Sequence, residues 1–171
     1  MKLRRTLFLS TLVLAFAALS PVAAQGVTKS TAVAGHQVPF LGILKGVETT
    51  TSFNPGPPPV VGIQGKGTGI ATQLGRFTYD NPHTLNPVAM HACGTWTFTA
   101  VNGTVTAAGC GDATVISGTP PTAVLSIVET WKITGGTGRF AGATGSFTVK
   151  RLLDQNTSVT IGFFTGTISS P

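Results

Sequence analysis

Charged side chains are scarce in this sequence. Asp, Glu, Lys and Arg together make up 9% of its 171 residues, whereas ordinary domains contain about 25%. The sequence has five acidic and eleven basic residues, and three of the basic residues lie before residue 25. Without the first 24 residues the net charge would fall from +6 to +3, because eight basic and five acidic residues remain. No basic run is left that could neutralise several phosphates, so no nucleic acid partner is expected.

Helical periodicity is also absent. From residue 25 onward the sequence is rich in Thr, Val and Gly, and turn signals recur at short spacing. This pattern is typical of antiparallel strands in a sheet that is closed or folded on itself, so the predicted fold class is all-β. The proline-rich run at 54–59 and the segment 80–90, with two Asn-Pro steps, are predicted loops. The predicted strands cover residues 38–53, 60–72, 76–79, a hairpin around Asn102-Gly103, a short segment at 113–116, and then 123–134, 145–154 and 157–168.

The first 24 residues have the organisation of an export signal. Lys2, Arg4 and Arg5 precede an apolar run at 7–19, and Val22-Ala23-Ala24 forms a small-residue cleavage site. We therefore expect a signal peptide at 1–24, a flexible segment at 25–37, one domain at 38–171, and a secreted or periplasmic protein. No later segment reaches the roughly 18 apolar residues of a membrane-spanning helix, so no transmembrane segment is expected.

The chain has only two cysteines, Cys93 and Cys110. In an exported protein such a pair persists as a disulfide, which we predict here. The two residues bracket a hairpin signalled by Asn102-Gly103. Pairing Val101 with Thr104 would set Cys110 opposite Thr95 and leave Cys93 one diagonal step away. A bulge at one of the nearby glycines would then be needed to close the bond.

Five glycines lie within residues 134–145, TGGTGRFAGATG. Alternating segments flank the run, so it predicts a tight connection between two strands. A dinucleotide fingerprint would need a glycine at position 141 and a following helix, and the sequence has neither. No cofactor is therefore expected. The glycines predicted to serve a structural turn, through positive φ or close backbone approach, are Gly135, Gly136, Gly138, Gly142 and Gly145.

The stretch GGTGRFAGATG at 135–145 resembles the Gly-Gly-Ser/Thr-Gly-x-Phe-x-Gly-Ala-x-Gly pattern of allene oxide cyclases and, less closely, the Gly-Gly-Thr-Gly-x-Phe run of dirigent proteins. ATQLGRFTYD at 71–80 and the block from Trp131 to Leu152 also resemble uncharacterised secreted bacterial proteins with the same barrel. The resemblance implies a single antiparallel eight-stranded β-barrel at 38–171 and a homotrimer. If the chain is an enzyme, the resemblance implies an isomerase or cyclase.

Glu129 and Arg151 each interrupt an apolar row of a predicted strand. A register that pairs Ile133 with Phe147 places the two charges opposite each other. A carboxylate removed from water needs compensation, and an arginine can provide it with two parallel hydrogen bonds. Three arrangements stay open: an ion pair satisfied inside the barrel, a polar anchor at the floor of a ligand cavity, or exposure through a register slip.

Glu48 is the second candidate carboxylate. Allene oxide cyclases carry a catalytic glutamate on the first strand, with an asparagine two residues on and a proline nine residues on. Here Thr50 and Pro57 follow Glu48 at those positions. Because the asparagine is missing, a catalytic role competes with that of a solvated charge at a strand end. Glu48 and Glu129 are the catalytic candidates.

Metal binding receives little support. His83, His91 and Cys93 lack both the CxxC and the HxxxH spacing, so we expect a disulfide, two loop histidines and no metal site. The large apolar residues of the predicted strands either pack the core or line a pocket. They are Trp96, Phe98, Trp131, Phe147, Ile161 and Phe163.

The preferred hypothesis is an exported β-barrel that binds a nonpolar or aromatic small molecule inside without catalysis. Glu129 and Arg151 would anchor the polar end of that ligand. The other candidate ligand contacts are Trp131, Trp96, Phe147 and Phe163. Two alternatives remain: a structural or surface-interaction protein with a filled barrel, and an isomerase, cyclase or stereo-directing protein that uses Glu48 or Glu129.

Overall fold

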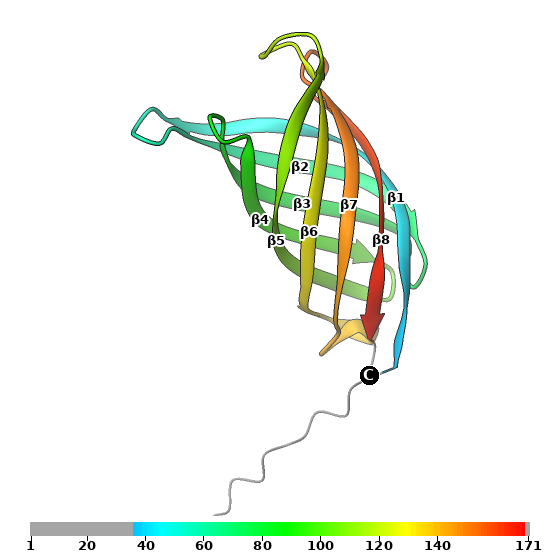
Figure 1. The fold of residues 1–171 in the computed structure, drawn as a ribbon. Coiled ribbons are helices and arrows are strands. Elements are labelled where there is room, and N and C mark those ends of the chain that lie inside the picture. The colour runs from blue at the N-terminus through cyan, green and yellow to red at the C-terminus, as the bar shows by residue number, and fades with distance from the viewer. Residues whose placement is uncertain (1–35, 170–171) are drawn as a thin grey trace, which may run out of the picture. The chain divides into compact units, whose positions relative to one another are not determined.

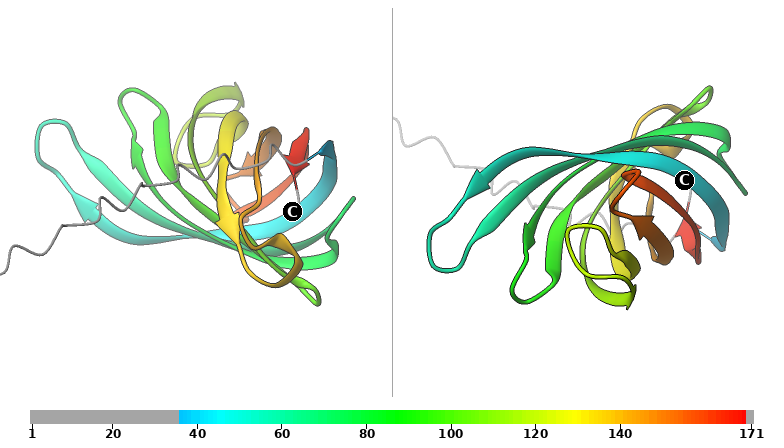
Figure 2. Two further views of the ribbon diagram at one scale, coloured as in Figure 1. Left: turned by 90° about the horizontal axis from the view of Figure 1, so that it is seen from below. Right: turned by 90° about the horizontal axis from the view of Figure 1, so that it is seen from above.

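A computed structural model of the chain describes residues 36–169. These residues form a closed antiparallel barrel of eight strands in chain order, which confirms the predicted fold (Figure 1). Pairing of β1 with β8 closes the barrel, and Figure 2 shows it from both ends. The predicted signal peptide and all but the last two residues of the predicted flexible segment lie outside the described residues. The strands are β1 (Gln37–Asn54), β2 (Val60–Ala71), β3 (Gly75–Asn86), β4 (His91–Ala100), β5 (Gly103–Ser117), β6 (Val124–Gly136), β7 (Thr144–Asp154) and β8 (Val159–Ser169).

One predicted loop is wrong, because β3 continues through most of 80–90 to Asn86. Pro82 lies within this strand and keeps its register with β2, opposite Gln64. A proline has no N–H for a ladder, and the pairing of β3 with β4 is interrupted between Asp80 and His83. The buried side-chain amide of Asn81 donates to the Thr95 carbonyl across this gap, at 2.9 Å. The strand therefore survives because a side chain replaces a missing backbone bond.

The barrel interior differs between its two ends. Rings of Phe40, Phe77, Phe98, Phe147 and Phe164 pack on one another near the turns that join β2 to β3, β4 to β5 and β6 to β7. Their centroids lie 5.2 to 6.1 Å apart in these contacts. Such edge-on and tilted packing is favourable for aromatic side chains. We call this the filled end, and the opposite end, where the other four turns lie, the open end.

The glycine-rich run joins β6 to β7 at the filled end, as predicted. It contains a short 3-10 helix, η1 (Gly138–Phe140), in which Phe140 is fully buried. Gly138 has a φ of 59° and Gly142 one of 74°, values that favour glycine. The Arg139 N–H donates to the Asn102 carbonyl at 3.0 Å, so the run docks on the turn between β4 and β5.

The predicted disulfide between Cys93 and Cys110 is present. The predicted hairpin register is wrong by two residues, because Ala100 pairs with Gly103 and the turn is Val101-Asn102. Cys93 and Cys110 then lie directly opposite each other, and no bulge is needed. The glycine run lies against this turn, and a side chain at residue 103 would overlap the Thr137 carbonyl.

The prediction that Phe163 and Ile161 face the interior is wrong. Phe163 is 48% exposed and Ile161 51% exposed on the outer surface. The inner row of β8 holds Phe164 and Ile168 together with two glycines, Gly162 and Gly166. A side chain at either glycine would overlap β7, at Arg151 or Phe147 respectively. The interior beside β7 therefore has no room for large side chains at positions 162 and 166 of β8.

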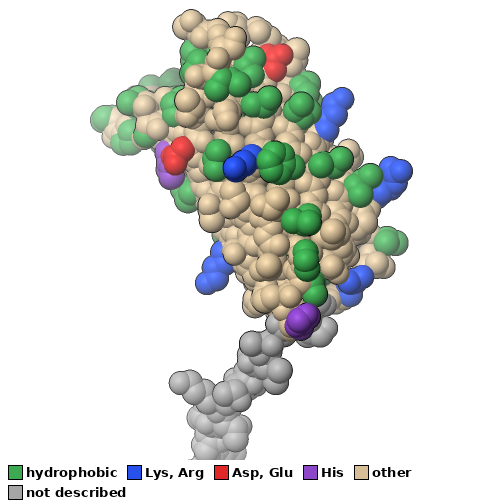
Figure 3. Space-filling model, turned by 45° about the vertical axis from the view of Figure 1, so that its right-hand side comes forward, with side chains coloured by type: hydrophobic (Ala, Val, Ile, Leu, Met, Phe, Trp, Pro, Cys, Tyr) green, Lys and Arg blue, Asp and Glu red, His purple; other side chains and the backbone are tan. Residues whose placement is uncertain are grey.

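The outer surface of β1, β7 and β8 mixes apolar and basic side chains. Ile43 and Lys150 both pair with Phe163, and Leu152 pairs with Ile161. Figure 3 shows such hydrophobic side chains interspersed with lysines and arginines. Within residues 36–169, no helix has the length and apolar character needed to cross a membrane.

Candidate functional site

A cavity of about 430 Å³ occupies the open end of the barrel. Its walls are mainly apolar and come from the open-end halves of the strands and from their connecting turns. Its polar lining includes the buried side chains of Glu48, His83, Glu129 and Arg151, and also Thr50, Asp112, Gln155 and Ser158. The apolar lining includes Val61, Ile63, Leu85, Met90, Leu125, Ile127 and Leu153.

Arg151 is the centre of the polar group. It projects inward from β7, and its side chain is 3% exposed. Its Nε and Nη2 groups donate to Oε1 of Glu129 at 3.3 and 2.9 Å. Its Nη1 group donates to Glu48 and, at 3.2 Å, to the Thr160 hydroxyl. Most of the five guanidinium donors are therefore used by protein acceptors, and the arginine has little capacity left for a ligand.

The predicted burial of Glu129 and Arg151 is confirmed, but their predicted register is wrong. Ile133 pairs with Gly145, so Glu129 lies opposite Val149 and Arg151 lies opposite Ile127. A shift of two residues keeps both charges on the inner face and makes them diagonal neighbours. The hydrogen bonds also differ from the expected parallel pair, since both donors meet one carboxylate oxygen.

The charges around Arg151 hold it in the protonated state. Burial alone would lower its pKa, but the charges of Glu129 and Glu48 and their hydrogen bonds raise the pKa above its ordinary value. Two carboxylates share this one guanidinium, so the group carries one negative charge in excess. A buried group of this kind favours ligands with hydrogen-bond donors or positive charge.

Glu48 is not the solvated charge at a strand end that was predicted as the alternative to a catalytic residue. Its side chain is 8% exposed and lines the cavity. Alternation along β1 from Phe40 through Leu44 places Glu48 on the inner face, so this signal was available in the sequence. Arg151 binds Oε1 of Glu48, and within residues 36–169 no donor binds Oε2. Glu48 can therefore still accept a hydrogen bond from a ligand.

Glu129 is more fully satisfied than Glu48. Oε1 accepts both bonds from Arg151, and Oε2 accepts a hydrogen bond from the Trp131 indole N–H at 3.4 Å. Trp131 lies on the same strand as Glu129, two residues closer to the filled end. These bonds indicate that Glu129 mainly holds the arginine in place.

His83 was predicted to lie in a loop, but it lies on β3 and is 9% exposed. Its Nδ1 atom is 3.0 Å from the Asn81 carbonyl oxygen. Because a carbonyl only accepts, Nδ1 carries the proton and Nε2 of a neutral ring has a free lone pair. His83 lines the cavity together with Glu48. His83 Nε2 therefore gives the cavity a second hydrogen-bond acceptor, in addition to Glu48 Oε2.

Tyr79 lies between the charged group and the aromatic core. Its ring packs on Trp96 with centroids 4.6 Å apart, and its buried hydroxyl has no hydrogen-bond partner among the described residues. Burial raises its pKa from 10.0 to about 12; Arg151 lowers it, and Glu48 and Glu129 raise it. The neutral phenol therefore separates the filled end from the charged floor of the cavity.

Comparison with known proteins supports the fold. No family model and no curated protein sequence matches the chain. Among solved structures, the pterocarpan synthase dirigent protein GePTS1 is similar, with a TM-score of 0.50 and 14% sequence identity. The match covers 79% of this chain and 86% of that chain. The chain has a dirigent-like barrel fold. The likeness to allene oxide cyclases stays a prediction.

The aromatic residues predicted to contact a ligand lie elsewhere in this dirigent-like barrel. Trp96, Trp131 and Phe147 are each no more than 2% exposed and pack in the core below the charged group. Phe163 faces outward. The cavity walls consist instead of aliphatic side chains and prolines. Those on β6 and β7 belong to the apolar rows that Glu129 and Arg151 interrupt, whereas Leu85 on β3 falls in the segment predicted to be a loop.

Proposed function

We propose that this chain binds a small, predominantly apolar or aromatic molecule at the open end of its barrel. The observation that carries the proposal is the cavity itself, with apolar walls around a compact polar floor. Its volume of about 430 Å³ lies within the roughly 300–1,000 Å³ typical of small-molecule sites. The cavity also counts against the alternative of a completely filled structural barrel.

The floor limits the chemistry of the ligand. Glu48 Oε2 and His83 Nε2 are acceptors without protein donors among the described residues, whereas the donors of Arg151 are largely used. A ligand with an amino group or two hydroxyl groups at one end would have enough donors for both acceptors. An anionic ligand would meet the excess negative charge. We therefore propose a neutral or cationic ligand that places its donor group on the floor.

Export belongs to the same proposal. A disulfide between Cys93 and Cys110 is typical of oxidising compartments, which supports a secreted or periplasmic location. A ligand carrier in such a compartment would meet its ligand outside the cytoplasm. The trimer implied by the family resemblance is also a prediction.

Titration with the neutral dye Nile red tests the binding proposal. We expect saturable fluorescence enhancement with one dye per barrel. Leu85→Trp should abolish it, because residue 85 lines the cavity and a larger ring would fill it. Val88→Trp is the matched control, since Val88 is 78% exposed and outside the lining. Both variants should keep the melting temperature of the parent.

Equal dye binding by both tryptophan variants would place the dye elsewhere and refute the cavity as its site. Native mass spectrometry of protein from its natural source complements the titration. It should show a retained compound of low mass, and the mass of the assembly reports the number of copies. Bare protein that also fails to bind Nile red would contradict the proposal.

A second candidate function is isomerisation or cyclisation of the bound molecule. The shared cavity position of His83 and Glu48 favours it, since Nε2 can take a proton while a carboxylate stabilises the resulting imidazolium. Incubating the retained compound with protein tests this idea. Conversion that His83→Gln abolishes without loss of binding would favour an enzyme, and an unchanged compound would favour a carrier.

A further inference from the structure

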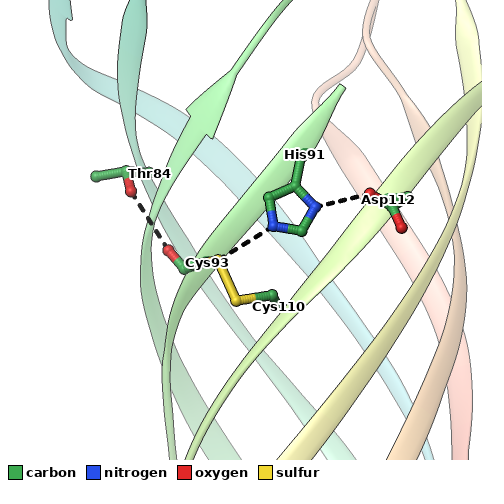
Figure 4. The surroundings of a disulfide bond; sticks show 5 residues. All are labelled: Thr84, His91, Cys93, Cys110 and Asp112. Atoms are coloured by element: carbon green, nitrogen blue, oxygen red, sulfur yellow. Dashed lines mark hydrogen bonds and ion pairs between the residues drawn. A yellow bond between two sulfur atoms is a disulfide. The ribbon is translucent and has the colours of Figure 1, made fainter. Parts of the chain in front are cut away.

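A second cluster of reactive side chains lies on the outer face of β4 and β5, near the open end, where Asp112 also borders the cavity. Cys93 on β4 and Cys110 on β5 face each other and form the disulfide. His91 precedes Cys93 by two residues and pairs with Asp112, which follows Cys110 by two residues. Alternation along the strands therefore puts all four side chains on one face, as Figure 4 shows.

The histidine in this cluster is held by a carboxylate and directed at sulfur. His91 Nδ1 lies 2.7 Å from Oδ1 of Asp112, and the carboxylate accepts a hydrogen bond from Nδ1–H. His91 Nε2 lies 3.4 Å from Sγ of Cys93. A carboxylate on one ring nitrogen fixes the tautomer and leaves the other nitrogen free to bind a metal. The side chains of His91 and Asp112 are 46% and 77% exposed, so solvent reaches the cluster.

We propose that reduction of the disulfide converts this cluster into a zinc site. The Cys93 and Cys110 thiolates and Nε2 of His91 would be the ligands, and Asp112 would orient the histidine. The three ligand atoms already lie within 4.8 Å of one another. Two thiolates and an imidazole are preferred zinc ligands, and solvent can supply the fourth position.

The distances required by zinc are close to those present. Zn–S and Zn–N bonds of about 2.3 and 2.05 Å at a tetrahedral angle separate sulfur from nitrogen by about 3.6 Å. The observed distance from Cys93 Sγ to His91 Nε2 is 3.4 Å. Two thiolates on the same ion would lie about 3.8 Å apart. Residues directly opposite on paired strands can reach this separation by rotation of their side chains.

The barrel supplies a frame that reduction leaves in place. Around the disulfide, β4 pairs with β5 from His91 to Ala100, and the other edges of these strands pair with β3 and β6. Opening one side-chain link breaks none of these backbone bonds. The four residues therefore keep their relative positions when the sulfurs become free.

The redox step requires a reductant such as a trialkylphosphine. The phosphine donates two electrons, takes oxygen from water and becomes a phosphine oxide, while the S–S bond breaks and each sulfur gains one proton. Zinc binding then displaces both thiol protons. The oxidised protein offers only the imidazole and carboxylate, so the disulfide controls whether the site exists.

Metal titration of oxidised and phosphine-reduced full-length protein tests this proposal. Reduced protein should bind one Zn²⁺ per chain in competition with a colorimetric chelator, and oxidised protein should not compete. With Co²⁺ the reduced form should show the visible bands of tetrahedral cobalt and a thiolate charge-transfer band. Asp112→Asn should weaken zinc binding by about 10- to 100-fold, and His91→Ala should weaken it further.

His36→Ala is the matched control, because His36 is exposed and is not one of the clustered residues. Zinc binding by oxidised protein, or binding unaffected by His91→Ala, would overturn the proposal. Near-ultraviolet circular dichroism monitors the fold throughout. If reduction unfolds the chain, restoration of the native spectrum by zinc would support the site, and failure to restore it would refute the site.

Discussion

Arg151 is the residue on which the interior charges depend. It neutralises one of two carboxylates and hydrogen bonds to both, and it also binds the Thr160 hydroxyl. Thr160 in turn donates to the Leu152 carbonyl at 2.9 Å, which fixes its orientation. The arginine thus links three strands, β1, β6 and β8, to its own. The position of the cavity floor follows from this one side chain.

Arg151→Met should lower the free energy of unfolding by about 3–5 kcal/mol, because it leaves two buried carboxylates without a counter-charge. Lys150→Met is the matched control, since its side chain is exposed on the outer face of the same strand. Urea denaturation of both variants at neutral pH measures the effect. An Arg151→Met variant as stable as the control would show that the ion pairs add nothing.

Tyr79→Phe should leave stability unchanged or raise it by about 1–3 kcal/mol, because it removes a buried hydroxyl without a partner. The chain contains a single tyrosine, so the ultraviolet absorbance of tyrosinate reports on this residue alone. Folded protein should keep the phenol neutral until pH about 12, whereas the unfolded chain should ionise near 10.0.

The raised pKa of Tyr79 also makes the stability of the fold depend on pH. Between pH 10 and 12 the unfolded state binds fewer protons at Tyr79 than the folded state, so this contribution to stability falls as pH rises. Below pH 10 it is fully present. Denaturation of parent and Tyr79→Phe across this range isolates the contribution from that of the lysines. Parallel curves for the two proteins would contradict the raised pKa.

At the scale of the element, the sequence pattern predicted strand faces better than strand partners. Alternation placed Glu129, Arg151 and Trp96 on the inner face, and the structure agrees. Both hairpin registers were wrong by two residues, a shift that preserves the face. The alternation of side chains has a period of two, so it does not distinguish registers that differ by two residues.

Strand β8 shows a different limit. Its two faces both carry large apolar residues, so alternation alone could not decide between Phe163 and Phe164. The decision lies with the neighbouring strand, since Arg151 and Phe147 fill the space next to Gly162 and Gly166. The cavity residues on β3 were missed because Pro82 suggested a loop. Compensation by Asn81 depends on a partner strand that local pattern does not reveal.

The inner glycines of β1 and β2 make room for large rings from β3. A side chain at Gly46 would overlap the Tyr79 hydroxyl and the Lys66 carbonyl. Gly46→Ala should therefore destabilise the barrel by about 1–3 kcal/mol. Gly56→Ala is the control, because the nearest atom to the added carbon, Asn54 Oδ1, would be 3.3 Å away. Thermal unfolding compares the two, and equal melting temperatures would contradict the crowding at Gly46.

At the scale of the whole molecule, the two ends of the barrel have different roles: the filled end stabilises the fold, and the open end holds the cavity. The aromatic core at the filled end supplies most of the buried apolar contacts, and the charged layer of Arg151, Glu48 and Glu129 separates it from the cavity. This separation leaves the open end free to hold a ligand without removing the core. The two ends should therefore respond differently to truncation.

Phe98→Ala should lower the free energy of unfolding by about 3–5 kcal/mol, because it opens a cavity in the filled end. Phe98 is 0% exposed, and its ring packs on those of Phe40, Phe77 and Phe147. Leu85→Ala should cost less, since Leu85 is only partly buried and already borders empty space. Its main effect should be altered Nile red affinity. Denaturation and dye titration of both variants measure this division; a Leu85→Ala variant as destabilised as Phe98→Ala would show that the open end is packed like the core.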